Sequence, residues 1–167
     1  MTTCSRRFGW LLLILTCSTG AACAQQQPAP LQYADDFAAL GRLAAANRLP
    51  IMLVFTRPGC PYCARAKHDH LEPLSASPGL GVKVVLREIE APNELIPLRD
   101  FDGTMTTHAE FSRKYAVRAV PTVIVVDSRG KPLADALIGL NLPEFYNLYL
   151  EQAIDTARLK LRAPTDH

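Results

Sequence analysis

The sequence predicts a single α/β domain in which a mixed β-sheet lies between layers of helices. Apolar runs such as Ile51–Phe55 and Thr122–Asp127 alternate with segments of helical periodicity, and turn residues separate them. The predicted elements follow the order αβαβαββα, which a mixed sheet flanked by helices accommodates. A run that is apolar throughout is typical of a strand buried on both faces. Without its first 24 residues, the 167-residue chain is of a size that suits one domain.

The first half of the domain is predicted to contain two helices and two strands. Asp35 and Asp36 can cap a helix that continues to Asn47, because apolar residues recur at helical spacing after them. The apolar run Ile51–Phe55 predicts a strand. The next helix is expected over Pro61–Leu71, with the proline in the first turn, where its missing N–H costs nothing. Residues 82–89 alternate well enough to predict a second strand.

The second half begins with a segment of different character. Residues 91–106 are predicted to be irregular, because they contain two prolines and an Asp-Gly turn signal. Thr107 and Glu110 form a capping-box pattern that opens a short helix to Tyr115. The remaining predicted elements are a strand over 122–127, its hairpin partner over 133–138, and a long closing helix capped near Asn141.

Residues 1–24 have the pattern of a cleaved signal peptide. Arg6 and Arg7 form a positive n-region, residues 8–15 form an apolar h-region, and Ala-Cys-Ala at 22–24 is a cleavage site. The apolar stretch is about half of the roughly 20 residues that a spanning helix needs, so no transmembrane segment is expected in the mature chain. We therefore expect a periplasmic protein. The alternative is a chain anchored to the membrane by a lipid on Cys23.

The rest of the chain divides into a flexible leader over 25–34, a domain over 35–162 and a loose tail over 163–167. The leader is predicted from its polar, proline-containing start. Removing residues 1–24 removes two arginines and no acid, so 18 basic and 16 acidic residues become 16 of each. A neutral chain without a basic run gives no electrostatic basis for binding nucleic acid or an anionic membrane.

Cys60 and Cys63 are the only cysteines outside the predicted signal peptide. A disulfide between residues three apart closes a very small loop and adds little stability, which favours redox use over a structural bond. Cys60 is expected at a helix N-terminus, where the dipole favours an anion and lowers the thiol pKa, so it is the predicted nucleophile. Arg57 is expected to add positive charge there. Cys63 is predicted to resolve the mixed disulfide by attacking Cys60.

Metal binding is the competing interpretation of the same cysteines. His68 and His70 could complete a zinc set, but helical residues two apart point about 200° from each other and cannot both converge on the cysteines. A copper carrier would need a third ligand, and His108 is the other candidate. We expect the histidines to be solvated surface residues. No metal site is predicted, and no cofactor other than the redox-active Cys60–Cys63 disulfide.

The element order, with Cys-x-x-Cys at the junction of the first strand and second helix, resembles the thioredoxin fold. Residues 117–122 resemble the cis-proline loop of thioredoxins, which faces the redox pair across a substrate groove. The Pro-Gly-Cys-Pro-Tyr-Cys run, the insert at 100–103 and the Val-Pro-Thr loop are most similar to the periplasmic SoxW-type thioredoxins associated with sulfur oxidation. The resemblance covers about residues 35–161 and implies that Pro61, Tyr62, Val120 and Pro121 contact substrate.

The sequence also departs from that family. Val54 stands six residues before Cys60, where thioredoxins have a buried aspartate that assists proton transfer, and no other acid in the predicted strand replaces it. The proton of Cys63 is therefore expected to pass to water or to a backbone group. Gly59 replaces the tryptophan that precedes the first cysteine, and Ala119 replaces a glycine before the cis-proline pair.

Together these features predict a periplasmic thiol–disulfide oxidoreductase that reduces disulfides of exported partner proteins through Cys60 and Cys63. The sequence contains no nicotinamide or flavin motif, and the periplasm is kept oxidising, so re-reduction by a membrane electron donor is expected. The Pro-Tyr dipeptide between the cysteines does not distinguish reductase, oxidase and isomerase. The alternative from another class is a copper or other metal-binding chaperone of thioredoxin fold that uses the same cysteines.

Overall fold

The computed structural model describes residues 29–163. The predicted signal peptide, the start of the leader and residues 164–167 of the tail lie outside the described residues. The helices are α1 (Phe37–Asn47), α2 (Pro61–Ala66), a π-helical turn (Lys67–Leu71), α3 (Glu72–Ala76), α4 (His108–Lys114), a 3₁₀ turn (Pro143–Phe145) and α5 (Tyr146–Arg162). The strands are β1 (Ile51–Thr56), β2 (Val85–Glu90), β3 (Pro97–Arg99), β4 (Met105–Thr107), β5 (Thr122–Val126) and β6 (Leu137–Ile138).

The main sheet is mixed and has the strand order β2-β1-β5-β6. Strand β1 is parallel to β2 and antiparallel to β5, and β5 is antiparallel to β6. The predicted order αβαβαββα is confirmed when α2, the π-helical turn and α3 are taken as one helical segment and the β3–β4 hairpin is taken as an insert. The α/β architecture with a central mixed sheet is therefore as predicted.

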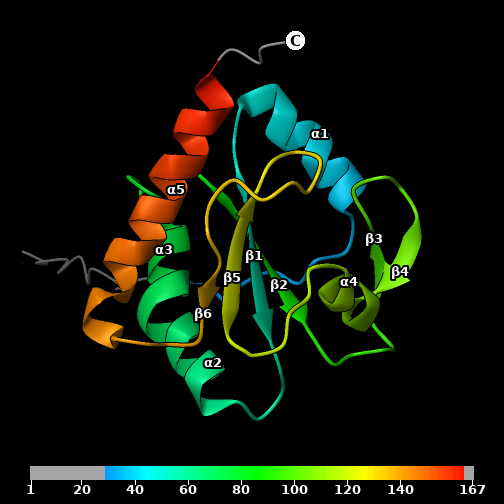
Figure 1. Ribbon diagram of the computed structural model, residues 1–167, viewed down its shortest axis with the longest axis horizontal. Helices are drawn as coiled ribbons and strands as arrows, with labels where there is room; N and C mark the ends of the chain where they lie inside the picture. The colour runs from blue at the N-terminus through cyan, green and yellow to red at the C-terminus, as the bar shows by residue number, and fades with distance from the viewer. Residues whose placement is uncertain (1–28, 164–167) are drawn as a thin grey trace, which may run out of the picture.

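Helices cover both faces of this sheet (Figure 1): α2, α3 and α5 lie on one side, and α1 and α4 on the other. Strand β1 is buried along its whole length, as its continuous apolar run predicts. Its alternate side chains enter different cores, because successive residues of a strand point to opposite faces. Met52 and Val54 pack toward α5, whereas Leu53 and Phe55 pack toward Phe37 of α1.

Two of the three predicted helix caps are confirmed, and of Asp35 and Asp36 it is Asp36 that caps α1. Asp36 is the N-cap of α1, and its carboxylate accepts a hydrogen bond of 2.7 Å from the Ala39 N–H. Thr107 is the N-cap of α4 and accepts from the Glu110 N–H at 3.2 Å. The starts of both helices are therefore set by local signals in the sequence.

The helix that follows the cysteines is longer than predicted and is not uniform. It continues to Ala76 and contains the π-helical turn. The Glu72 N–H bonds to the carbonyl of Lys67, five residues earlier. Pro73 follows directly and has no N–H with which to continue a regular α-helical pattern, which explains why the register changes here. The turn lies directly after α2, and its first residue, Lys67, lines the pocket beside the cysteines.

The prediction of a flexible leader over 25–34 is wrong for its last residues. The Glu88 N–H donates to the carbonyl of Gln32 at 2.8 Å, and the Ala34 N–H donates to the carbonyl of Glu88 at 2.9 Å. Leu31 and Ala34 are buried. The leader therefore runs along the outer edge of β2, where its apolar side chains leave water and its backbone pairs with an otherwise free strand edge.

The segment predicted to be irregular over 91–106 contains the short β3–β4 hairpin. Its turn includes Phe101, whose ring stacks on Phe37 of α1 with centroids 4.7 Å apart. The Arg99 N–H also donates to the carbonyl of Asp35 at 2.8 Å. Stacking and backbone pairing with the start of α1 thus give order to a segment whose prolines and glycine indicate a loop.

Three other boundaries differ from prediction. The second strand begins at Val85 because Val82 is mostly exposed. The hairpin partner over 133–138 pairs as a strand only at Leu137–Ile138, although the Leu133 N–H also donates to β5. The closing helix begins with the 3₁₀ turn rather than at Asn141. None of the helices within residues 29–163 is long and apolar enough to cross a bilayer.

Candidate redox site

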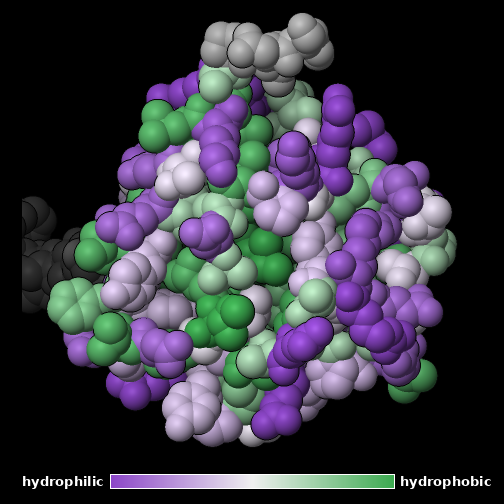
Figure 2. Space-filling view, in the orientation of Figure 1, coloured by the Kyte–Doolittle hydropathy of each residue, from purple (hydrophilic) through white to green (hydrophobic). Residues whose placement is uncertain are grey.

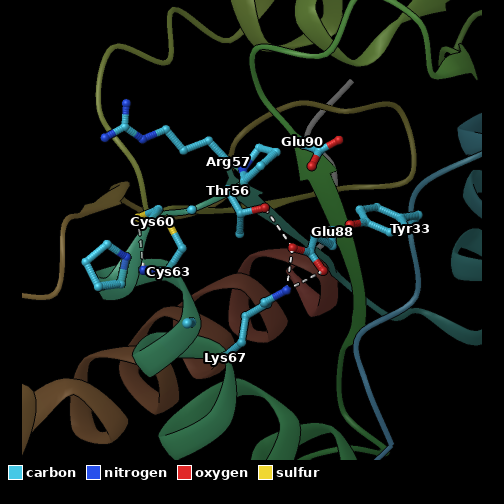
Figure 3. Close-up of a pocket in the computed structure, with 12 residues that line it drawn as sticks. Tyr33, Thr56, Arg57, Cys60, Cys63, Lys67, Glu88 and Glu90 are labelled. Carbon is cyan, nitrogen blue, oxygen red and sulfur yellow. Dashed lines mark hydrogen bonds and ion pairs between the residues drawn. A yellow bond between two sulfur atoms is a disulfide. The ribbon is translucent and has the colours of Figure 1, made fainter.

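The two cysteines lie where β1 ends and α2 begins (Figure 3), and their sulfur atoms are disulfide-bonded. Gly59 has a φ of 68°, which a glycine adopts without strain as the chain turns from strand to helix. Cys60 is the N-cap of α2, and its Sγ accepts a hydrogen bond of 3.1 Å from the Cys63 N–H. Cys60 is 7% exposed and Cys63 2%. Both cysteines are therefore largely buried, and Cys60 is the more exposed residue of the two.

A pocket of about 320 Å³ opens beside the disulfide, and both cysteines line it. Its far wall holds charged and polar side chains from other elements: Thr56 of β1, Lys67 of the π-helical turn, and Glu88 and Glu90 of β2. Tyr33 of the leader completes this wall. Burial and the charges of Glu88 and Glu90 raise the pKa of Tyr33. Tyr33 of the leader thus contributes a phenol to the pocket. The prediction of a flexible leader does not include this contribution.

Glu88 is a buried carboxylate in this pocket. Its side chain is 4% exposed, and Lys67 Nζ lies 2.8 Å from Oε1 and 3.1 Å from Oε2. The Thr56 hydroxyl donates to Oε1 at 2.7 Å. Burying a charge is costly unless it is paired and hydrogen-bonded, and both conditions hold here. Figure 3 shows the carboxylate between the Lys67 ammonium and the Thr56 hydroxyl.

The expectation that the Cys63 proton passes to water or to a backbone group leaves out Glu88, which lines the same pocket as Cys63. Glu88 is the register partner of Val54 across the parallel β1–β2 pair, so the two side chains point to the same face of the sheet. The acid missing from β1 therefore has a counterpart on the neighbouring strand. Its signal in the sequence is the alternation of β2, which places Glu88 on the same face as the buried Leu86.

The loop before β5 forms a groove beside the redox pocket. The Val120–Pro121 peptide bond is cis, and Pro121 is buried. Val120 lines a groove of about 470 Å³, together with Ala91, Pro92, Val117, Arg118, Ala119 and Arg57. Arg57 also lines the pocket beside the disulfide, so the groove and that pocket are neighbours that share this residue. Within residues 29–163, the backbone N–H and C=O of Val120 have no hydrogen-bond partner.

The other predicted site residues take different positions. Pro61 lines the redox pocket in the first turn of α2, whereas the neighbouring Tyr62 is 65% exposed and lines neither the pocket nor the groove. Arg57 is exposed, and in Figure 3 its guanidinium extends away from Glu88 and Glu90. Its role in tuning Cys60 stays a prediction, as do the separate roles of the two cysteines.

The expectation that the histidines are solvated is wrong for two of them. His70 is buried against Tyr146, and its Nδ1 lies 2.9 Å from the Asn147 side-chain oxygen. His108 is fully buried: its Nδ1 accepts from the Glu90 N–H at 2.9 Å, and its Nε2 lies 2.8 Å from the carbonyl of Ala34. These partners require a neutral ring protonated at Nε2. Burial accordingly lowers the pKa of His108.

This geometry bears on the metal-binding alternative. Both ring nitrogens of His108 are bonded to backbone groups, and His68 points into solvent with its side chain 82% exposed. Among the side chains of residues 29–163, no three His, Cys, Asp or Glu residues lie close enough together to hold a metal ion.

Comparison with known proteins identifies the family. Residues 38–154 match the family model described as a thioredoxin-like domain. The chain belongs to the thioredoxin-like family. No curated protein sequence matches it at a significant level.

Solved structures show the same fold at low sequence identity. A thioredoxin-fold protein from Helicobacter pylori is 22% identical with a TM-score of 0.50, over 68% of this chain and 73% of that one. Malassezia sympodialis thioredoxin is 16% identical with a TM-score of 0.52, over 80% and 98% of the two chains. Fasciola hepatica thioredoxin is 21% identical with a TM-score of 0.50, over 75% and 97%.

The family and the site agree with each other. The disulfide-bonded Cys-x-x-Cys pair lies at the junction of β1 and α2, inside the region that the family model matches. A thioredoxin-like domain with such a pair is a thiol–disulfide oxidoreductase.

Proposed function

We propose that this protein reduces disulfides of exported partner proteins, with Cys60 as the attacking thiolate and Cys63 as the resolving thiol. The observation that carries the proposal is the disulfide-bonded pair beside an open groove, with Cys60 the more exposed of the two. The Cys60 thiolate would be stabilised by the Cys63 N–H, which already bonds to its sulfur, and by the positive end of the helical segment.

The reaction transfers two electrons from the dithiol to the substrate disulfide. The Cys60 thiolate attacks one substrate sulfur, the substrate S–S bond breaks, and the first substrate thiolate leaves and takes a proton from water. Cys63 then loses its proton and attacks the Cys60 sulfur of the mixed disulfide. The Cys60–Cys63 bond forms as the second substrate thiolate leaves.

Glu88 is the group that we assign to the proton of Cys63. It lines the same pocket as both cysteines, and its carboxylate is held in place by Lys67 and Thr56. A pocket of about 320 Å³ has room for water to carry the proton between the thiol and the carboxylate. This assignment replaces the expectation that water or a backbone group serves alone.

Location and electron supply complete the proposal. The signal-peptide pattern of residues 1–24 supports export to the periplasm, with a lipid anchor on Cys23 as the alternative. The oxidised pair must be reduced again after each cycle. A membrane electron donor supplies these electrons, because the sequence has no motif for a nicotinamide or flavin cofactor.

Reduction potential tests the direction. The purified protein is equilibrated with glutathione buffers, and the fraction of Cys60–Cys63 dithiol is measured by alkylation. The reduction potential of a reductase should lie near that of thioredoxin, about −270 mV, and that of an oxidase near about −120 mV. A potential near the oxidising end, together with no reduction of insulin disulfides by the dithiol form, would overturn the reductase proposal.

Single-turnover kinetics test the role of Glu88. Glu88→Gln keeps the shape and an acceptor oxygen but cannot take a proton at neutral pH. Resolution of the mixed disulfide should slow about ten- to a hundredfold at pH 6–7 and recover near pH 9, where the thiol ionises unaided. Glu90→Gln is the matched control, because Glu90 lines the same pocket but bonds to Asn93. Equal slowing by both variants, or none by Glu88→Gln, would contradict the assignment.

A further inference from the structure

Two arginines line the groove beside the redox pocket. Arg57 follows β1 and Arg118 precedes β5, so residues distant in sequence place two guanidinium groups on one groove. Both side chains are exposed, and neither has an ion-pair partner within residues 29–163. In Figure 2, hydrophilic side chains gather on the right-hand side of this face of the molecule, where Figure 1 places α4 and the β3–β4 hairpin.

Acidic residues of the segment that follows β2 lie outside the groove lining, and two of them are in ion pairs. Glu90, at the end of β2, accepts a hydrogen bond from the Asn93 amide. Glu94 pairs with Arg113 at 2.9 Å, and Asp100 pairs with Lys114 at 2.6 Å. No acidic side chain lines the groove itself. Neither guanidinium therefore has an ion-pair partner within residues 29–163, although Glu90, whose carboxylate bonds to a neutral amide, lines the redox pocket together with Arg57.

The groove also has a free backbone edge. The N–H and C=O of Val120 are unpaired within residues 29–163, and Val120 is half-buried against the groove. An extended peptide can satisfy such an edge by adding backbone hydrogen bonds, while its side chains are selected by the groove walls. Side chains on one face of an extended segment recur every second residue, about 7 Å apart, and Arg57 and Arg118 line one groove with Val120.

We propose that this groove selects substrate segments with acidic side chains next to the reacting cysteine. The inference rests on the proposed function and names its substrate class: an extended, acidic segment of an exported protein. Carboxylates beside the substrate cysteine bind the guanidinium groups of Arg57 and Arg118, and the segment backbone pairs with Val120. The two charges favour approach of acidic partners and disfavour basic ones.

Three peptides of one sequence test the proposal. Each carries a single cysteine in a mixed disulfide with thiopyridine, and the flanking positions are both Glu, both Gln or both Lys. Attack by the Cys60 thiolate on the peptide sulfur releases thiopyridone, which is followed by absorbance. Each rate is divided by the rate with 2-mercaptoethanol, which removes the effect of the flanking charges on the peptide disulfide itself.

The normalised rate for the Glu peptide should exceed that for the Lys peptide about five- to tenfold at low ionic strength, and about twofold in half-molar salt. Arg57→Gln/Arg118→Gln should reduce the ratio to about one to two, and Arg118→Gln alone to an intermediate value. Arg42→Gln/Arg129→Gln removes the same charge from exposed positions outside the groove and should keep the ratio.

The outcomes separate this inference from the proposed function. Reaction of the wild type with the uncharged disulfide of thiopyridine but no preference among the peptides would overturn the inference alone. The inference alone would also be overturned if the Arg57→Gln/Arg118→Gln variant kept the full preference for the Glu peptide, or if the Arg42→Gln/Arg129→Gln control lost that preference equally. No reaction with any of the disulfides would overturn the proposed function.

Discussion

Lys67→Met tests whether Glu88 is held as a buried charge. Glu88 is 4% exposed at its side chain, and Lys67 is the cation within ion-pair distance of it among residues 29–163. Removing one partner of a fully buried pair costs about 3–5 kcal/mol, because a charge remains buried without compensation. Lys67 is itself 28% exposed, so some water reaches the pair. We therefore expect a loss of about 2–3 kcal/mol in the free energy of unfolding.

The assay is urea unfolding of the oxidised protein at pH 7, with the m-value compared between variants. Lys67→Met/Glu88→Leu removes both charges and should cost about 1 kcal/mol or less, so the two substitutions are strongly coupled. Arg65→Met is the matched control on the same helix: it breaks the exposed Arg65–Asp69 pair and should cost less than about 0.5 kcal/mol. A loss from Lys67→Met no larger than that of the control, or additive effects in the double variant, would refute the reasoning.

Two further predictions concern His108 and Val54. Because burial lowers the pKa of His108, the unfolded chain binds a proton below about pH 6.5 that the folded chain does not bind. The contribution of the neutral ring to the free energy of unfolding is therefore complete above about pH 6.5. Below that pH the free energy of unfolding falls, by up to about 1.4 kcal/mol per pH unit. His108→Gln should flatten the dependence of the urea midpoint on pH between 7 and 5, and an unchanged slope would show that another group is responsible. Val54→Asp places a second carboxyl on the same face as Glu88, its register partner, so it should lower the urea midpoint without speeding mixed-disulfide resolution. Faster resolution between pH 5 and 9 would show that Glu88 does not handle the proton.

Local sequence signals sufficed for the parts of the fold that they determine. The continuous apolar run of β1 predicted its burial, and Asp36 and Thr107 predicted the starts of α1 and α4. The position of the cysteines after β1 followed from the same pattern, because a strand, a glycine turn and a proline at the helix start occur in succession. Each of these features is decided by residues close together in the chain.

The features that were missed depend on contacts between distant residues. In the sequence, Glu88 is a polar residue in a strand. Its burial is explained by Lys67 and Thr56, which lie 21 and 32 residues earlier in the chain. The burial of His108 depends on the carbonyl of Ala34, 74 residues away. The polar start of the leader predicts a flexible segment, whereas Leu31 and Ala34 supply the apolar surface that packs its end beside β2. Tertiary pairing decides such positions, and no local pattern contains it.

Trapping of the mixed disulfide tests the central claim most directly. Cys63→Ala leaves Cys60 free to attack but removes the group that resolves the product, so this variant should accumulate a covalent complex with a disulfide-containing protein substrate, reversible by dithiothreitol. Cys60→Ala should form none, because Cys63 is 2% exposed behind the helix start. Complex formation is measured by non-reducing electrophoresis and mass spectrometry after acid quenching. Equal trapping by both variants, or trapping by Cys60→Ala alone, would contradict the assignment of Cys60 as the nucleophile.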